Sequence, residues 1–303
     1  MKTIWVLENV KRNLTFYNKL QILLLISSLS LWKKYHPTHN TFFYCDGLTY
    51  KIFKELGILE LWDHVEIFSY PENINREIFW SSPKTKIISE STEPFIMVDH
   101  DFLIFKNIDE YFKDEIICSY DERSDNWYPT KNDVYNKKLT TPVEFIIPYA
   151  SNVSLFYIPN PEFAQRYGKQ VLKNHEEFTT MNISTMTANH MILSEQYMLR
   201  QWIEKENIPY KCLSKNIWDC HKLGFIKDQE TDKGIWNLKE SLLYYKHYGA
   251  EERRIQNREE GYSYDETISF LKRCVKAGKL IDIEQLESKI EVILNESNPR
   301  KLD

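Results

Sequence analysis

Glycine is scarce in this chain, which has only 8 glycines among its 303 residues. Neither a Gly-x-Gly-x-x-Gly pattern nor a Walker-type phosphate loop occurs anywhere in the sequence. Both motifs depend on glycine, because there the backbone must approach a phosphate or pyrophosphate group closely. Their absence excludes a dinucleotide site of the glycine-fingerprint type and a P-loop nucleotide site.

Cysteine is also sparse, and its pattern restricts the kind of protein. The five cysteines are Cys45, Cys118, Cys212, Cys220 and Cys274. Their number is odd and no Cys-x-x-Cys pair occurs, which argues against a disulfide framework and against a structural zinc site. The amino terminus lacks a basic segment followed by an apolar stretch and a cleavage site, so no signal peptide is predicted. We therefore expect a reducing compartment and a cytoplasmic protein.

An excess of positive charge and a long apolar run are missing as well. Lys and Arg number 39 against 44 Asp and Glu, a net charge of −5, so nucleic acid is not expected as a partner. The most apolar stretch, Leu20 to Trp32, is too short to cross a bilayer and predicts a buried helix. No transmembrane segment is expected, and peripheral contact with a membrane stays open.

The first part of the chain alternates between apolar runs and helical patterns. Strands are predicted at Thr3–Leu7, Thr41–Cys45 and Trp62–Phe68, with helices at Phe16–Tyr35 and Thr49–Leu56 between them. This β-α-β-α-β order predicts an α/β fold with a parallel sheet flanked by helices. Residues 1–260 are predicted to form the main domain, and residues 261–303 a C-terminal α-helical appendage.

The most informative stretch runs from Pro94 to Phe105. Phe95 to Val98 is an unbroken apolar run, typical of a strand that is buried on both faces. Asp99 and Asp101 follow it, at the carboxyl end where open α/β sheets bind ligands. Alternate residues of an extended strand point the same way, so both carboxylates could reach one Mg²⁺ or Mn²⁺ ion. A surface turn with two solvated aspartates is the alternative interpretation.

Two predicted helices carry further candidate residues. Lys84 lies in a helix predicted over Pro83–Ser91, just before the Asp-x-Asp strand. Glu195 lies in a long helix predicted over residues 189–205 and is followed by Gln196. Each residue has a simpler interpretation as a solvated side chain on the surface of its helix. Their positions near the predicted strands make them candidates for contacts with a substrate.

Candidate residues also follow predicted strands. Asn152 lies in a turn predicted at residues 150–152, between strands predicted at residues 144–148 and 153–158. Asn also tolerates the backbone of tight turns, which is the structural alternative for this residue. Glu8 follows the first strand and Asp46 follows the second, at the strand ends where open α/β sheets bind ligands. For Asp46, an ordinary Asp46-Gly47 turn is the alternative.

A last strand is predicted over residues 241–248. It would deliver His247 to a turn at Gly249. Two carboxylates and a neutral imidazole would suit an octahedral metal ion with positions left for phosphate oxygens. His247 is therefore the third candidate metal ligand, beside Asp99 and Asp101. A histidine of the core or of a turn is the structural alternative.

Together these motifs resemble the GT-A glycosyltransferases, most closely the glycogenin-like group and its bacterial and viral relatives. The corresponding stretches are Lys84, Val98-Asp-His-Asp101, Asn152-Val-Ser154, Glu195-Gln196 and His247-Tyr-Gly249. The resemblance covers about residues 1–255 and is carried by motifs alone. It implies a Rossmann-like GT-A fold, with a mixed, mostly parallel central sheet flanked by helices.

The resemblance also implies an activity. The expected reaction transfers a sugar from a nucleotide-diphosphate sugar, usually a UDP-sugar, to a glycan, lipid or protein acceptor. Mn²⁺ or Mg²⁺ would be held by Asp99, Asp101 and His247. Contacts with the donor would come from Glu8, Asp46, Lys84, Asp99, Asn152 and Gly249.

Catalytic roles follow from the same resemblance. Lys84 would assist the leaving diphosphate. Glu195, or an acid from residues 121–133, would be the base that an inverting enzyme needs on the acceptor hydroxyl. A retaining enzyme would not need that base, so the stereochemistry stays open. The aromatic pair Trp127-Tyr128 and residues 210–240 are predicted to form the acceptor surface.

Two other functions stay open at this point. The first is an inactive GT-A domain that binds carbohydrate or serves as a scaffold. The second is a metal-dependent phosphohydrolase of the haloacid-dehalogenase type, which also has an Asp-x-Asp motif after an apolar strand. That family has the motif on its first strand, whereas here it lies in mid-chain and is followed by Phe102-Leu103. The phosphohydrolase is therefore the less favoured of the two.

Overall fold

The computed structural model describes most of the chain. The described residues are 1–8, 18–123, 133–181, 188–214, 217–219, 224–226, 245–247, 255, 258 and 263–296. For residues 217–219, 224–226 and 245–247 the description covers the backbone only. The chain forms two compact units: the first comprises residues 1–67, 99–109 and 234–303, and the second residues 68–98 and 110–233.

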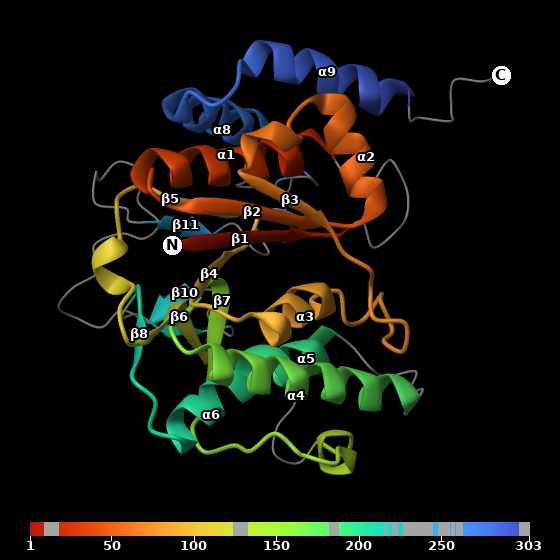
Figure 1. The fold of residues 1–303 in the computed structure, drawn as a ribbon, viewed down its shortest axis with the longest axis vertical. Coiled ribbons are helices and arrows are strands. Elements are labelled where there is room, and N and C mark those ends of the chain that lie inside the picture. The colour runs from red at the N-terminus through yellow and green to blue at the C-terminus, as the bar shows by residue number, and fades with distance from the viewer. Residues whose placement is uncertain are drawn as a thin grey trace. The chain divides into compact units, whose positions relative to one another are not determined.

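The first unit contains strands and helices from both ends of the chain (Figure 1). Its strands are β1 (Lys2–Leu7), β2 (Asn40–Cys45), β3 (His64–Ile67), β5 (Phe102–Ile104) and β11 (Tyr245–His247). Its helices are α1 (Lys19–Tyr35), α2 (Gly47–Leu56), α8 (Tyr264–Gly278) and α9 (Ile283–Glu296), with a 3₁₀ turn at Leu59–Leu61.

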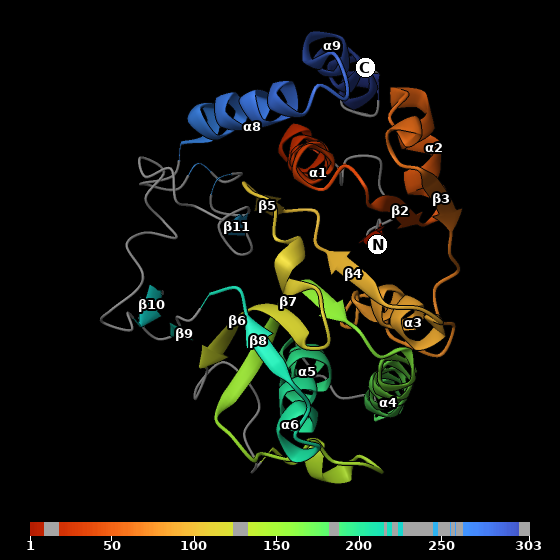
Figure 2. The same ribbon diagram turned by 60° about the vertical axis from the view of Figure 1, so that its left-hand side comes forward.

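The sheet of the first unit confirms the predicted β-α-β-α-β pattern. β1 pairs in parallel with β2, and β2 pairs in parallel with β3. Figures 1 and 2 both show α1 and α2 next to these strands, with α8 and α9 forming a further layer over them. Parallel strands joined through helices need this arrangement, because each crossover lays its helix on the sheet.

Helix α1 is buried almost all round, as its apolar sequence predicts. Its three serines face the core as well, and each has a small neighbour or a polar partner. The Ser27 hydroxyl donates to the carbonyl of Leu271 in α8 at 3.1 Å, and the Trp5 indole N–H donates to Ser28 at 3.0 Å. Gly278 of α8 lies against Ser30 so closely that a Cβ there would be 2.5 Å from the Ser30 Cβ. Small residues therefore let the two helices approach each other.

The C-terminal helices begin at the residues that the sequence indicates. Ser263 caps α8 by accepting a hydrogen bond from the backbone N–H of Glu266 at 3.2 Å. Asp282 accepts hydrogen bonds from the N–H groups of Glu284 and Gln285 ahead of α9. Lys289 of α9 donates to the carbonyl of Leu56 in α2 at 3.1 Å, so the predicted appendage packs within the first unit.

The second unit is built on a mixed sheet (Figure 2). Its strands are β4 (Phe95–Val98), β6 (Ile116–Arg123), β7 (Tyr149–Ile158), β8 (Tyr210–Cys212), β9 (Ile217–Asp219) and β10 (Gly224–Ile226). Its helices are α3 (Ser82–Glu90), α4 (Pro161–Thr180), α5 (Ala188–Ile192), a π-helical turn η5 (Leu193–Tyr197) and α6 (Met198–Lys205), with a 3₁₀ turn at Asn136–Lys138.

The pairing within this sheet is antiparallel at its centre. β7 pairs antiparallel with both β4 and β6, whereas β8 and β9 run parallel to β6. All four residues of β4 are buried, as its unbroken apolar run predicts. Helices α3 and α4 pack together at Gly168, where a Cβ would be only 2.6 Å from the backbone nitrogen of Ser89.

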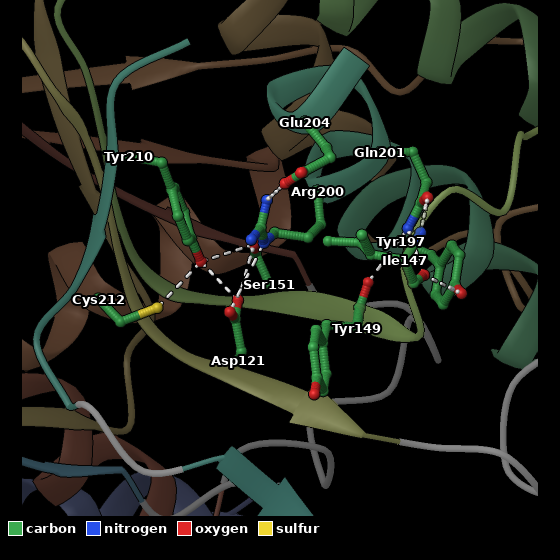
Figure 3. Close-up of polar contacts among 10 residues, drawn as sticks. All are labelled: Asp121, Ile147, Tyr149, Ser151, Tyr197, Arg200, Gln201, Glu204, Tyr210 and Cys212. Carbon is green, nitrogen blue, oxygen red and sulfur yellow. Dashed lines mark hydrogen bonds and ion pairs between the residues drawn. The ribbon is translucent and has the colours of Figure 1, made fainter. Parts of the chain in front are cut away.

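One local prediction is wrong. Residues 144–148 are not a strand, and residues 150–152 are not a turn, because β7 runs without a break from Tyr149 to Ile158. The buried amide of Gln201 takes the place of a strand partner for the preceding segment (Figure 3). Its Oε1 accepts from the N–H groups of Ile146 and Ile147, and its Nε2 donates to the carbonyl of Ile147 at 3.0 Å. This tertiary contact is invisible in the local pattern.

The architecture is therefore a mixed α/β fold with sheets flanked by helices, as the sequence predicts. The parallel pairing expected for the chain holds throughout β1–β3, while the sheet of the second unit contains both directions. Within the described residues, no helix combines the length and apolar character that crossing a membrane requires.

Candidate functional site

Asp99 and Asp101 lie in a tight turn directly after Val98. The N–H of Phe102 donates to the carbonyl of Asp99 at 3.1 Å and closes this turn. Asp101 is buried, with 6% of its surface exposed, and Asp99 is half-buried. The extended geometry from which we expected the two carboxylates to converge is therefore wrong, because the backbone turns between them. Their use as ligands of one ion stays a prediction.

The next strand brings a distant segment to this turn. β5, which starts at Phe102, pairs antiparallel with β11, and His247 is the register partner of Phe102. The backbone of the predicted third ligand therefore lies opposite the residue that follows Asp101, although His247 and Asp101 are 146 positions apart in the sequence. The residue types and this pairing fit a divalent metal ion that prefers oxygen and imidazole ligands.

Side-chain geometry at this position is described only in part. Among the residues whose side chains are described, no three His, Cys, Asp or Glu residues gather as a metal site would require. The side chain of His247 is not among them, and Gly249 lies outside the described residues. The metal role of Asp99, Asp101 and His247 therefore stays a prediction, now supported by the strand register.

The two other candidates of the first unit follow β1 and β2. Glu8 comes directly after β1 and is buried, with 8% of its surface exposed. Asp46 caps helix α2: its Oδ1 accepts from the N–H groups of Leu48 and Thr49, and its Oδ2 accepts from the Thr49 hydroxyl at 2.8 Å. Capping thus accounts for an aspartate at this position. The predicted contacts of both residues with a nucleotide stay predictions.

In the second unit, Lys84 forms a buried polar contact with β7. Its ammonium group donates to the carbonyl of Val153 at 2.9 Å and lies 3.9 Å from the carboxylate of Glu195. Lys84 and Glu195 are both buried, with 9% and 3% of their surfaces exposed. A charge pair at this depth is strongly coupled, because little water screens it. The structure thus brings together two residues that lie 111 positions apart in the sequence.

Asn152 joins the same region through β7. Its amide donates to the carboxylate of Glu122 on β6 at 2.6 Å, and its Oδ1 accepts from the N–H of Ser154 at 3.0 Å. Glu122 is buried too, with 8% of its surface exposed. It belongs to the acidic residues 121–133 that the sequence offered as a base, but its pairing with Asn152 could not be foreseen. Lys84, Asn152, Glu195 and Glu122 are hereafter called the Lys84 cluster.

The helical turn that carries Glu195 has an unusual backbone. The helix expected over residues 189–205 exists, but its centre is the π-helical turn η5. The Tyr167 hydroxyl donates to the backbone carbonyl of Glu195 at 2.9 Å; burial and the nearby charge of Glu195 raise the Tyr167 pKa well above its usual range. The side-chain oxygen of Gln196 is buried and has no hydrogen-bond partner within the described structure. Single π-helical turns are frequent at functional sites.

The candidate residues thus fall into two groups, each within one unit. Asp99, Asp101 and the backbone of His247 meet in the first unit, and the Lys84 cluster forms in the second. Of the predicted acceptor surface, Trp127-Tyr128 and Trp236 lie outside the described residues. Trp218 is part of β9, where its backbone is the register partner of Glu122.

Comparison with known proteins identifies a family and a solved structure with a similar fold. No curated protein matches the sequence. A solved structure with 10% sequence identity and a TM-score of 0.49 covers 95% of this chain and 100% of its own; it is described as the galactosyltransferase LgtC in complex with donor and acceptor sugar analogs. Residues 2–257 match a family described as a family of unknown function, DUF6734. The match spans more than half of the chain, which therefore belongs to the DUF6734 family.

Proposed function

We propose that this protein is a metal-dependent glycosyltransferase. It would transfer a sugar from a nucleotide-diphosphate sugar, most simply a UDP-sugar, to a glycan, lipid or protein acceptor. The observation that carries the proposal is the pairing of β5 with β11. Through it, the backbone of His247 lies beside the turn of Asp99 and Asp101, so that the backbone positions of all three proposed ligands belong to one small region.

The metal group in this proposal consists of Asp99, Asp101 and His247. Mn²⁺ and Mg²⁺ favour such ligands and leave coordination positions for phosphate oxygens. When bound, the ion would supply Lewis-acid stabilisation of the charge that develops on the leaving diphosphate. The turn closed by the Phe102 N–H holds the two carboxylates ready on one short backbone segment.

The Lys84 cluster would bind and orient the reacting sugar. It offers a cation, two carboxylates and an amide that are already held by contacts of 2.6 to 3.9 Å. Groups fixed in this way need little reorganisation when a substrate binds, which is the basis of electrostatic preorganisation. In this proposal Lys84 would favour negative charge on the leaving group, and Glu195 would accept a proton from the acceptor if the enzyme is inverting.

The first test measures ligand binding by thermal shift. Wild-type protein would be melted with nucleoside diphosphates of each base and with nucleotide sugars, in Mn²⁺ and again in EDTA. A ligand that binds only the folded state at 100 times its Kd stabilises it by about 2.7 kcal/mol. We expect one nucleotide to raise the Tm with Mn²⁺ present and to have no effect in EDTA.

A pair of variants makes this test specific for the proposed ligands. Asp101→Asn keeps the shape of a buried side chain but removes its charge, so the Mn²⁺-dependent shift should disappear. Asp114→Asn makes the same chemical change at an exposed aspartate and should keep the shift. The proposal fails if neither Mn²⁺ nor any nucleotide stabilises the wild type, or if Asp101→Asn behaves like Asp114→Asn.

Donor hydrolysis separates a transferase from an inactive carbohydrate-binding module. An active enzyme slowly passes its sugar to water, so free sugar should accumulate only with Mn²⁺ and the nucleotide sugar that gave the shift. Asp101→Asn should slow this reaction by about a hundredfold or more, a typical cost of losing charge stabilisation at a reacting diphosphate. Metal-dependent binding without any hydrolysis or transfer would favour the inactive module.

A further inference from the structure

Figure 3 shows a second polar cluster around Asp121 and Ser151 of β6 and β7. Consecutive residues of a strand point to opposite faces, so Asp121 and Ser151 face away from their neighbours Glu122 and Asn152. We call this group the Tyr210 cluster; it consists of Asp121, Ser151, Arg200, Tyr210 and Cys212. Its members come from β6, β7, α6 and β8.

The Tyr210 hydroxyl is the centre of this cluster. It donates to the Asp121 carboxylate at 2.6 Å and lies 2.8 Å from the Ser151 hydroxyl and 3.0 Å from the Cys212 sulfur. A phenol has a single proton to donate, and Asp121 takes it. The phenol oxygen is therefore an acceptor for the Cys212 thiol, and the Ser151 hydroxyl reaches both the phenol oxygen and, at 3.4 Å, the Asp121 carboxylate, to which it donates. One side chain thus joins three strands.

Arg200 connects the helix to the same centre. Its Nε lies 3.5 Å from the Asp121 carboxylate, and its guanidinium carbon lies 4.6 Å from the centre of the Tyr210 ring. Its Nη1 also donates to Glu204 at 3.1 Å. Burial opposes the charge of Arg200, but Asp121, Tyr210 and Glu204 together raise its pKa above the ordinary value. The guanidinium is therefore a permanent cation that ties α6 to β6.

The protonation of the cluster is stable near neutral pH. Burial, followed by Cys212, Cys118 and Asp121, raises the pKa of Tyr210 well above its usual range. Burial, followed by Asp121 and Cys118, does the same for the Cys212 thiol. Both groups therefore keep, near neutral pH, the protons that their hydrogen bonds use.

Each anchoring residue is close in the sequence to a residue of the candidate site. Asp121 precedes Glu122, and Ser151 precedes Asn152. Arg200 follows Gln196 by four residues, the spacing that brings two helical residues to one face. A shift of one anchor by a fraction of an ångström would therefore be passed to the neighbouring site residue, because a strand or helix moves as a stiff unit.

We propose that the Tyr210 cluster is a positioning element for the site formed by Glu122, Asn152 and the Glu195–Gln196 turn. Its contacts fix β6, β7 and the η5–α6 helix relative to one another. This fixes the positions of Glu122 and Asn152, which lie on the other face of the strands, and of the Glu195–Gln196 turn, which precedes Arg200 on the helix. The inference rests on the proposed glycosyl transfer for its consequence in catalysis. Its structural content is independent of that reaction.

The test removes the central hydroxyl and keeps the ring. Tyr210→Phe would lose the bonds to Asp121, Ser151 and Cys212 but keep the packing of the ring against Arg200. Tyr157→Phe is the matched control: that tyrosine is buried in β7 of the same unit, and its hydroxyl donates to the Lys113 carbonyl at 2.8 Å, away from the candidate residues. Both variants should lower the Tm by a similar, small amount, roughly 2–4 °C.

Hydrogen exchange gives a readout that does not depend on activity. In Tyr210→Phe the backbone amides of residues 149–154 and 193–200 should exchange several-fold faster than in the wild type, because local opening becomes easier. In Tyr157→Phe these amides should keep the rate of the wild type. Equal exchange in the two variants at these residues would overturn the inference, whether or not the protein transfers sugar.

Kinetics then tests the consequence for catalysis. With the donor identified by the binding screen, Tyr210→Phe should lower kcat by about tenfold and change KM for the donor by less than about threefold, as loss of alignment does. Tyr157→Phe should keep both constants. If kcat per folded molecule is unchanged in Tyr210→Phe, the cluster is only structural and the inference is wrong.

A milder variant covers the case in which Tyr210→Phe folds poorly. Ser151→Ala removes one polar partner of the phenol oxygen, and it should change exchange and kcat in the same direction by a smaller factor. A wild type that shows no transfer or hydrolysis would contradict the proposed function, while the exchange experiment would still decide the positioning role. The two failures are therefore distinguishable.

Discussion

The two groups of candidate residues are organised in different ways. In the first unit, Asp99 and Asp101 lie in a backbone turn, and the register of β5 and β11 brings the backbone of His247 beside that turn. In the second unit, the side chains of the Lys84 cluster contact one another and the backbone directly. In the proposed function, an incoming cation would gather ligands that backbone pairing brings together, whereas the groups that would bind a neutral sugar have to be oriented beforehand.

Among single substitutions, the largest effect on stability is expected at the Lys84–Glu195 pair. Lys84→Met keeps the length of the side chain but leaves the buried Glu195 carboxylate without its cation and the Val153 carbonyl without its donor. Loss of one partner of a buried pair costs about 3 kcal/mol or more. We therefore expect the free energy of unfolding, measured with urea, to fall by about 3 kcal/mol.

The control for this variant lies on the same helix. Lys86 is part of an exposed pair with Glu90 at 3.8 Å. Lys86→Met should change the free energy of unfolding by at most about 0.5 kcal/mol, the usual worth of a surface pair. An equal loss of unfolding free energy in the two variants would show that direct side-chain contact does not organise the second unit.

The glycines at helix contacts test both units in the same way. A Cβ at Gly168 would clash with the backbone of Ser89, and a Cβ at Gly278 would clash with Ser30. Gly168→Ala and Gly278→Ala should each lower the free energy of unfolding by about 1–3 kcal/mol, the usual cost of overpacking. Gly47→Ala is the control, because nothing lies within 4 Å of its Cβ position.

Kinetics would sharpen this comparison further. A displaced α3 carries Lys84 with it, so Gly168→Ala should also reduce donor hydrolysis, whereas Gly47→Ala should leave it intact. Thermal melts and urea titrations of the three variants check the stability effect. A stable Gly168→Ala protein would mean that α3 and α4 can separate freely, which would contradict their close packing.

Acid provides the most gradual effect. Burial, partly opposed by Asp109 and reinforced by His39, lowers the pKa of His36 in the first unit to about 4. Burial lowers the pKa of His175 in the second unit to about 3, although a backbone contact with Met191 opposes the shift. In the unfolded chain both groups titrate near 6.5. Below that pH the unfolded state binds protons that the folded state does not.

The sign of the pH effect follows from this difference. The contribution of the two histidines to the free energy of unfolding is fully present above about pH 6.5. It falls as the pH is lowered toward 4 for His36 and toward 3 for His175. Each histidine contributes a slope of up to about 1.4 kcal/mol per pH unit. Urea titrations between pH 7 and pH 4 should show this fall in the free energy of unfolding. His36→Gln and His175→Gln should each reduce the slope of the free energy of unfolding against pH. An unchanged slope in both variants would contradict the assignment.

Much of the site was predictable because its residues follow local rules. An unbroken apolar run identifies β4, and carboxylates after it stand where ligands bind in α/β folds. A cap is equally local: Ser263 and Asp282 accept hydrogen bonds from backbone N–H groups at the starts of α8 and α9. The contact between Lys84 and Glu195 fits the expectation that both belong to one site, although the sequence offered no geometric reason for it.

What could not be predicted depends on partners that are distant in the sequence. Asn152 was expected in a turn because Asn suits turns, yet it lies within β7, where Glu122 on the neighbouring strand accepts its hydrogen bond. The loop at residues 144–148 is held by the Gln201 amide, which no pattern of hydrophobicity can reveal. Tyr210 and Arg200 were missed for the same reason, since each looks ordinary within its own segment.

By itself, then, the sequence determined the alternation of strands and helices, the buried character of α1 and β4, and the residue types available for a metal or a substrate. These properties depend on neighbours within a few positions along the chain. Only the tertiary structure decided that β11 pairs with β5, that Glu122 meets Asn152, and that Tyr210 joins three strands. Such contacts depend on strand register and on close packing across the whole unit, which one stretch of sequence cannot specify.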